Sequence, residues 1–156
     1  MRDVERPDDL KVLSVVGAGR SGTTVLAAIL GEVDGFSAAG ELRWVWERGV
    51  LEQRPCGCGS VPAACPVWRP VIHTALARLG GRASETDNRL LAAEVVAAQH
   101  RLARWYNQPR ALAAVRANRP AWADLQLVRA ITDAAITAFA EATAAQIGRA
   151  SCRERV

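Results

Sequence analysis

The hydrophobic pattern changes character along the chain, from short apolar runs broken by glycine to long stretches with helical periodicity. Residues 10–16 form an apolar run of strand length, and residues 24–30 repeat apolar side chains at helical spacing. A second short strand is expected over residues 36–39, where the chain reaches Gly40. The N-terminal part is therefore predicted to run from a strand through a glycine loop into a helix and a second strand.

Beyond residue 70 the periodicity predicts helices. The expected ranges are 70–79, 88–106, 109–117 and 120–145. The second of these has a predicted buried stripe of Leu91, Val95, Ala98, Leu102 and Trp105. The stripe predicted for the last comprises Leu125, Val128, Thr132, Ala135, Phe139 and Ala142. Residues 54–68, rich in cysteine, proline and glycine, show little periodicity and are predicted to be a loop.

Composition narrows the class of protein. The chain has 156 residues, of which 50% are hydrophobic, and this suits one globular domain. Of the net charge of +4, the three arginines less one glutamate of residues 149–155 supply +2. Because no basic stripe interleaved with aromatic residues is present, we expect no nucleic-acid binding. The charged N-terminus and the interrupted apolar segments predict a cytoplasmic protein without a membrane span.

The strongest chemical signal is the stretch GAGRSGTT, residues 17–24, directly after the first expected strand. Loops that bind nucleoside triphosphates end in Gly-Lys-Ser/Thr, whereas here the cation is Arg20, placed before Gly22. Backbone N–H groups at a helix N-terminus, the guanidinium of Arg20 and nearby hydroxyl groups suit a tetrahedral oxyanion. Such a loop needs no magnesium ion.

The same stretch also fits the dinucleotide-binding pattern Gly-x-Gly-x-x-Gly through Gly17, Gly19 and Gly22. In that interpretation Glu41 would bind a ribose hydroxyl. A dinucleotide-binding domain requires repeated strand–helix units after the pattern, whereas this chain continues into a cysteine-rich loop and a series of helices. The context therefore disfavours dinucleotide binding.

Residues 15–26, VVGAGRSGTTVL, resemble the sulfotransferase family, in which a strand, a Gly-x-x-Arg-Ser-Gly-Thr-Thr/Ser loop and a helix bind 3′-phosphoadenosine 5′-phosphosulfate. The resemblance implies an α/β fold with a P-loop-type parallel sheet and flanking helices, truncated and helix-rich in this chain. It implies transfer of a sulfuryl group to a hydroxyl or amine of a small-molecule or carbohydrate acceptor, without a metal. The residues that it assigns to the co-substrate are Gly19, Arg20, Ser21, Gly22, Thr23 and Thr24.

The resemblance also implies a catalytic base. Some branches of the family carry a Gly-Glu shortly after the first helix, and Gly40-Glu41 lies at the matching place. Glu41 would accept the proton of the acceptor, with Arg20 countering charge on the leaving group. The alternative for Glu41 is a solvated turn residue paired with Arg43. His73 and His100 are interpreted as ordinary surface residues.

Three interpretations remain open for Cys56, Cys58 and Cys65. With His73 they would supply four zinc ligands, but Cys-x-Cys is closer than the usual spacing of zinc-binding pairs. A disulfide is disfavoured by a reducing cytoplasm. Packed free thiols are the favoured interpretation, and we expect no stoichiometric zinc.

The end of the sequence indicates an incomplete family member. Residues 1–147 are interpreted as the N-terminal part of a sulfotransferase-like domain, and residues 148–156 as a non-native or disordered tail similar to vector-derived sequence. The strand that would hold the 3′-phosphate is not evident, so little turnover is expected. Two other classes stay open: a kinase-like nucleotide-binding protein, and a non-catalytic helical interaction protein that retains the loop.

Overall fold

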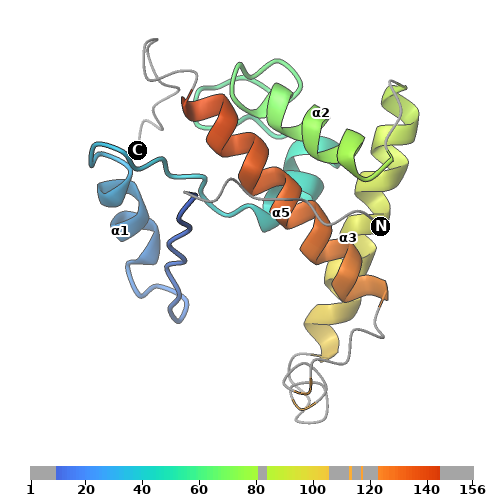
Figure 1. Ribbon diagram of the computed structural model, residues 1–156, viewed down its shortest axis with the longest axis horizontal. Coiled ribbons are helices and arrows are strands. Elements are labelled where there is room, and N and C mark those ends of the chain that lie inside the picture. Colours follow the sequence, from blue (N-terminus) through green and yellow to red (C-terminus); the bar gives the residue numbers. More distant parts are fainter. Residues whose placement is uncertain (1–9, 81–83, 106–112, 114–116, 118–122, 145–156) are drawn as a thin grey trace.

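The computed structural model describes residues 10–80, 84–105, 113, 117 and 123–144. Figure 1 shows the elements in these ranges, all of them helical. They are α1 (Thr23–Leu30), the π-helix η1 (Val45–Leu51), α2 (Trp68–Arg78), α3 (Glu85–Trp105) and α5 (Ala123–Ala144). The expected helix at 109–117 and the tail at 148–156 fall outside the described residues, apart from Ala113 and Ala117.

The prediction of a parallel sheet is wrong for the described part of the chain, which contains no strand. Residues 10–16 are irregular and mostly exposed: Leu13 is 62% and Val16 89% accessible. Residues 36–39 are likewise irregular, and half of Phe36 is accessible. A strand is stabilised by hydrogen bonds to a neighbouring strand, and neither apolar run has such a neighbour here. Apolar patterning without a pairing partner is therefore insufficient for a sheet.

Four helix predictions agree with the structure to within a few residues. The expected ranges 24–30, 70–79, 88–106 and 120–145 correspond to α1, α2, α3 and α5. Residues 54–67 are irregular with several turns, as expected for the cysteine-rich segment. The π-helix η1 was not expected, because its seven residues are too few to display a period.

The hydrophobic core lies among η1, α2, α3 and α5. Helix α5 packs against both α2 and α3, and α3 also packs against η1, as the crossing ribbons of Figure 1 illustrate. Each element supplies buried apolar side chains, among them Trp46 from η1, Leu76 from α2, Val95 from α3 and Ile131 from α5. Trp68 also contacts Phe139 with ring centroids 5.4 Å apart, which joins the start of α2 to α5.

The buried face of α5 differs from the predicted stripe. Ala135 and Phe139 are buried as predicted, but Leu125, Val128, Thr132 and Ala142 are only partly buried. The fully buried positions instead include Ile131 and Ala134. Because α5 contacts helices on two sides, its buried face is wider than a single stripe. In α3 the predicted Val95, Ala98 and Leu102 are buried, Leu91 is partly buried, and the side chain of Trp105 lies outside the described part.

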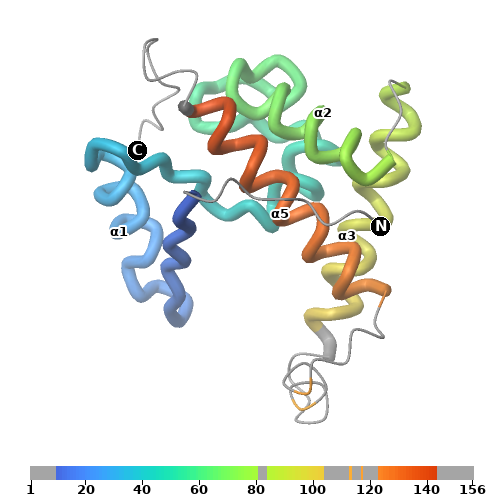
Figure 2. Tube along the Cα trace, in the orientation of Figure 1, coloured from blue at the N-terminus to red at the C-terminus, as the bar shows by residue number. Residues whose placement is uncertain are grey.

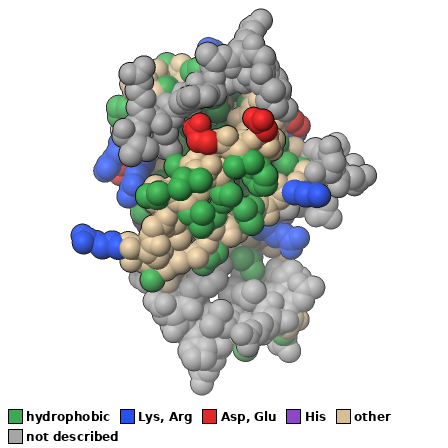
Figure 3. Space-filling view, turned by 90° about the vertical axis from the view of Figure 1, so that its left-hand side faces the viewer, with side chains coloured by type: hydrophobic (Ala, Val, Ile, Leu, Met, Phe, Trp, Pro, Cys, Tyr) green, Lys and Arg blue, Asp and Glu red, His purple; other side chains and the backbone are tan. Residues whose placement is uncertain are grey.

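Helix α1 stands apart from this core. None of its residues is buried, and Val25, Leu26 and Ile29 are each about half or more accessible. Figure 2 shows the chain turning after α1, over residues 31–35, and then continuing toward η1. Hydrophobic side chains gather on the face of the molecule that carries α1, which Figure 3 presents to the viewer.

The C-terminal end of η1 is held by side chains as well as by its own backbone. Glu52 donates its amide to the carbonyl of Glu47 at 2.9 Å, the five-residue step of a π-helix. Gln53, at a left-handed φ of 56°, donates from Nε2 to the carbonyl of Val50 at 2.8 Å. Arg89 of α3 donates to the carbonyls of Val50 and Leu51, both at 3.0 Å. This guanidinium therefore satisfies carbonyl groups that a helix end leaves free.

Ion pairs join the helices at the surface. Arg101 of α3 and Asp124 of α5 form a bidentate pair with distances of 2.8 and 2.7 Å. The hydrogen bond from Arg101 lowers the pKa of Asp124. Arg78 of α2 lies 3.2 Å from Glu141 of α5. Because both pairs are solvated, they contribute less to stability than the apolar contacts beneath them.

The buried face of α5 can be tested with a pair of alanine substitutions. We expect Ile131→Ala to lower the free energy of unfolding by about 2–5 kcal/mol, because Ile131 is 0% accessible and its loss leaves a cavity. Leu125→Ala removes a partly buried side chain and should cost about 1 kcal/mol. Urea denaturation followed by circular dichroism measures both values. Equal losses would contradict the observed orientation of α5.

The role of Arg89 leads to a second stability prediction. Arg89→Ala should lower the free energy of unfolding by about 1–2 kcal/mol, since it leaves the last carbonyls of η1 without their charged donor. Arg129→Ala is the matched control, because the Arg129 side chain is 81% accessible and lies 3.8 Å from Asp133 of the same helix. It should change stability by less than about 0.5 kcal/mol. If the two variants unfold at the same urea concentration, the cap at η1 contributes nothing.

Candidate functional site

The glycine loop leads directly into α1. Gly22, in the left-handed conformation at φ 80°, is the residue before the helix, and its carbonyl accepts from the amide of Leu26 at 3.0 Å. The amide of Ser21 donates to Ala18 at 3.1 Å and closes the preceding turn. The side chains of Ser21 and Thr23 lie so close to Gly17 that a Cβ there would meet them. The loop therefore brings these two hydroxyl side chains back over its own backbone.

Arg20 lies in the glycine loop with its side chain exposed. It adopts a left-handed φ of 64°, which is uncommon for a residue with a side chain, and it is exposed. Its guanidinium makes no hydrogen bond or ion pair with another residue that the structure describes. The amides of the first turn of α1 also lack intrahelical acceptors, as at every helix start. Cation and amides together make this end of α1 suited to an anion.

Glu41 lies on a different segment from the loop. The chain that carries it leaves the C-terminal end of α1, whereas the glycine loop lies at the N-terminal end (Figure 1). Glu41 is exposed, and its carbonyl accepts from the amide of Trp44 at 2.9 Å. No described contact joins its carboxylate to the loop or to Arg43. Arg43 instead stacks over Trp44, 4.5 Å from the ring centroid, on which Arg48 also stacks at 3.9 Å.

The two histidines lie at the surface. His73 is exposed on α2, and His100 on α3 has a side chain that is 51% accessible. His100 lies 3.5 Å from the carboxylate of Glu47 in η1. His73 is separate from the cysteine group, so the structure does not support it as a fourth ligand beside the thiols.

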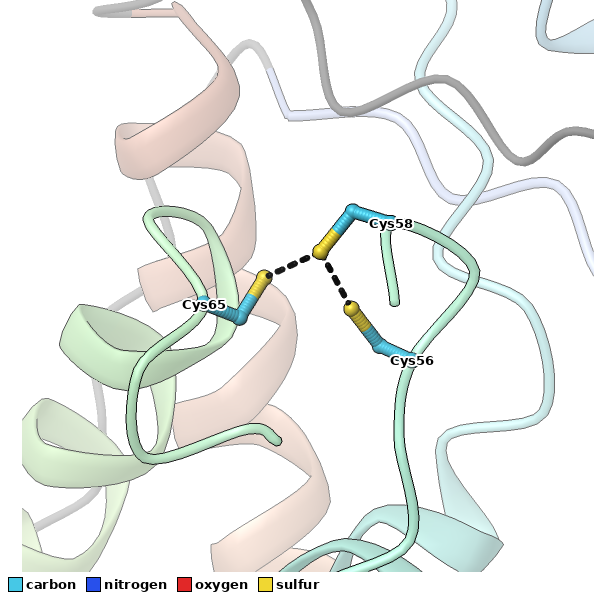
Figure 4. Close-up of side chains that lie close together, drawn as sticks. All are labelled: Cys56, Cys58 and Cys65. Atoms are coloured by element: carbon cyan, nitrogen blue, oxygen red, sulfur yellow. Dashed lines mark hydrogen bonds between the residues drawn. The ribbon is translucent and has the colours of Figure 1, made fainter. Parts of the chain in front are cut away.

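The structure brings the three cysteines of residues 54–68 together (Figure 4). The Sγ atoms of Cys56 and Cys58 are 2.8 Å apart, and those of Cys58 and Cys65 are 3.8 Å apart. All three lie within 4.8 Å of one another, and no other Cys, His, Asp or Glu of the described residues joins the group at that distance. Cys65 is fully buried in the core, Cys56 is half-buried and Cys58 is exposed. The group therefore extends from the core to the surface.

The environment of Cys56 favours its protonated thiol. Burial and the neighbouring sulfur atoms raise the pKa of Cys56 from 9.0 to about 11. Burial disfavours the thiolate, and hydrogen bonds with Cys58 and Cys65 add to this effect. Without a bound metal ion, the thiol of Cys56 is consequently a poor nucleophile at neutral pH.

The spacing in the sequence did not indicate that Cys65 would meet the Cys-x-Cys pair. A turn closes residues 56–60, with the amide of Gly59 donating to Cys56 at 2.8 Å and that of Cys56 donating to Ser60 at 2.9 Å. In a second turn the amide of Cys65 donates to the carbonyl of Val61 at 3.0 Å, and the chain returns toward the first turn. The available signal was the turn-forming composition of residues 56–65, in which a turn that contains Cys56 and Cys58 precedes one that ends at Cys65.

Comparison of the chain with protein-family models, curated proteins and solved structures found no match. None of the helices in the described ranges combines the length and hydropathy needed to cross a membrane.

The raised pKa of Cys56 predicts slow alkylation. At pH 8 the rise of the Cys56 pKa from 9.0 to about 11 lowers its thiolate fraction about 100-fold. A thiolate of higher pKa is more nucleophilic, and this raises the alkylation rate again by about 10-fold. Reduced, chelator-treated native protein should therefore react with iodoacetamide at Cys56 about 10-fold more slowly than urea-unfolded protein. Peptide mass spectrometry resolves the rate at each cysteine.

The pH dependence follows from the same shift. The native state holds the Cys56 proton more tightly than the unfolded state does, so this stabilising contribution is complete below pH 9 and is lost as the pH rises toward about 11. The alkylation rate of Cys56 in the native protein should therefore rise relative to its rate in the unfolded protein over the same interval. Equal rates at pH 8 in both states would show that neither burial nor the neighbouring thiols affect Cys56.

Proposed function

We propose that this chain is sulfotransferase-like and that its glycine loop binds the 5′-phosphosulfate of 3′-phosphoadenosine 5′-phosphosulfate. The observation that carries the proposal is the loop at the start of α1, where an exposed Arg20, the backbone amides and three hydroxyl residues lie next to one another in sequence. The likeness of residues 15–26 to the family motif supports the same ligand.

The expected interactions follow from the chemistry of the loop. Amides of the first turn of α1 hydrogen-bond to the 5′-phosphate, where the helix dipole favours negative charge. Arg20 binds two oxygens of the phosphosulfate with its planar guanidinium, and the hydroxyls of Ser21, Thr23 and Thr24 donate to the remaining oxygens. Because Arg20 supplies the positive charge, no magnesium ion is required.

The proposed reaction is an in-line displacement at sulfur. The acceptor hydroxyl or amine forms a bond to sulfur while the bond from sulfur to the bridging oxygen breaks, and 3′-phosphoadenosine 5′-phosphate leaves. Positioning and preorganised donors supply most of the rate enhancement, as in phosphoryl transfer. The acceptor proton is assigned to Glu41, and this assignment rests on the Gly40-Glu41 motif, since no contact brings Glu41 to the loop. A small-molecule or carbohydrate acceptor and a cytoplasmic location belong to the same proposal.

One structural observation keeps a non-catalytic role as the second candidate. The core formed by η1, α2, α3 and α5 is complete without α1 and the loop. A helical interaction protein would need only this core. Anion binding at the loop separates the two candidates, because a bare interaction protein has no requirement for Arg20.

The proposal predicts a loss of anion binding when Arg20 is removed. Arg20→Ala should weaken binding of 3′-phosphoadenosine 5′-phosphate by about 1.5–3 kcal/mol, the range for a hydrogen bond to a charged group. Isothermal titration calorimetry with and without magnesium measures the effect, and magnesium should make no difference. Arg129→Ala is the control, because that exposed arginine lies on α5.

Three results would lead to other conclusions. ATP binding that requires magnesium and survives Arg20→Ala would place the protein among kinase-like nucleotide-binding proteins. Binding of neither nucleotide by the folded protein would favour the helical interaction protein. Equal loss in Arg20→Ala and Arg129→Ala would indicate a nonspecific effect of net charge.

A further inference from the structure

The three-thiol group, defined as Cys56, Cys58 and Cys65, is the feature that the proposed function leaves unexplained. Figure 4 shows the three side chains pointing toward one another from two turns of the same loop. Three sulfur atoms within 4.8 Å form a more specific arrangement than packing requires, since Cys58 is exposed and gains little from burial there.

The backbone holds the three-thiol group in place. Gly59, at a left-handed φ of 83°, completes the turn between Cys56 and Ser60, a conformation that a larger residue rarely adopts. Cys65 is held by hydrogen bonds from its amide to Val61 and Pro62 at 3.0 and 3.2 Å, and its carbonyl accepts from Arg69 at 3.0 Å. Most of the conformational entropy lost in bringing the sulfur atoms together is therefore lost on folding, before any ligand binds.

The distances suit a thiolate-bound metal ion. Tetrahedral coordination at the usual zinc–sulfur distance of about 2.3 Å places neighbouring sulfurs about 3.8 Å apart. Cys58 and Cys65 already have this separation, at 3.8 Å. Cys56 and Cys58 are 2.8 Å apart and would have to separate by about 1 Å. Because Cys58 is exposed, its side chain has room for that movement.

The start of α2 supplies a backbone donor to one of the sulfurs. The amide of Trp68, the first residue of α2, donates to Sγ of Cys65 at 3.5 Å. Cys65 therefore lies at the N-terminal end of α2, where the helix dipole would favour the negative charge of a metal-bound thiolate. Residues 53–68 contain no acidic side chain to oppose that charge.

We propose that Cys56, Cys58 and Cys65 bind one zinc ion through three thiolates. Binding displaces three thiol protons, and no residue in the described ranges supplies a fourth ligand. The ion joins the turn at residues 56–60 to the buried start of α2, so its role in the fold is to fix the loop on the core. This inference replaces the expectation of unligated thiols drawn from the spacing alone, and it is independent of the function proposed for the glycine loop.

The test uses the full chain under reducing conditions. Elemental analysis should find one zinc per chain, and chelator-treated protein should take up one equivalent of Zn(II) with a rise in its unfolding temperature. Co(II) serves as a second probe, because sulfur-to-metal charge-transfer absorption reports thiolate ligation. Cys58→Ser should weaken Zn(II) binding at least about 100-fold, more than the loss of an outer-shell partner, and remove the absorption change.

The variants keep folding and binding separate. Cys58 is exposed, so Cys58→Ser should retain the circular dichroism of the native chain, whereas Cys65→Ser alters the core. His73→Ala should bind Zn(II) as tightly as the native chain, because His73 is not part of the three-thiol group. The proposal is overturned if the folded protein takes up no Zn(II), if uptake survives Cys58→Ser, or if it is lost in His73→Ala. Recovery of a disulfide in place of zinc would instead assign the thiols a redox role.

Discussion

The packing of α5 against α2 and α3 is the contact on which the rest of the structure depends. Alanine dominates the buried face of α5, with Ala134, Ala135 and Ala138 all shielded from water. Small side chains let helices approach closely, and the larger Ile131 and Phe139 fill the space between the close contacts. Because α5 is far from α2 in sequence, this contact joins the middle of the chain to its later part. The turns that bring the cysteines together lie between η1 and α2, and both of those helices belong to the same core.

Sequence periodicity predicted the helices well and the sheet wrongly. The physical reason is that the hydrogen bonds of a helix are local, whereas those of a sheet are not. The bonds of α2, α3 and α5 close within each helix, so local patterning predicts these elements closely. A strand has to find its partners elsewhere, and residues 10–16 have none in the described structure despite their apolar character. The same reasoning explains the error in the α5 stripe. A helical period shows that a face is apolar, whereas the positions of α2 and α3 decide how wide the buried face is.

The two candidate sites also differ in whether they depend on local or on non-local contacts. The glycine loop is a local feature, and its position before α1 followed from residues 17–30 alone. The three-thiol group depends on the turn that returns Cys65 to the Cys-x-Cys pair, and no spacing rule contains that turn. The link between Arg89 and η1 spans almost forty residues and was equally hidden from the sequence. Non-local contacts such as these become visible only when the core has placed the helices.

The glycine loop and the three-thiol group differ in how firmly the fold holds them. Cys65 and its neighbours Val67 and Val71 are buried, so the start of α2 is fixed by the core and can position a ligand atom. Helix α1 has no buried residue, and its apolar Val25 and Ile29 face outward. Preorganised donors lose less conformational entropy on binding than mobile ones, and therefore bind more tightly for the same contacts. The three-thiol group is therefore the more firmly held of the two sites. Tight anion binding at the glycine loop requires a further surface that holds α1 in place.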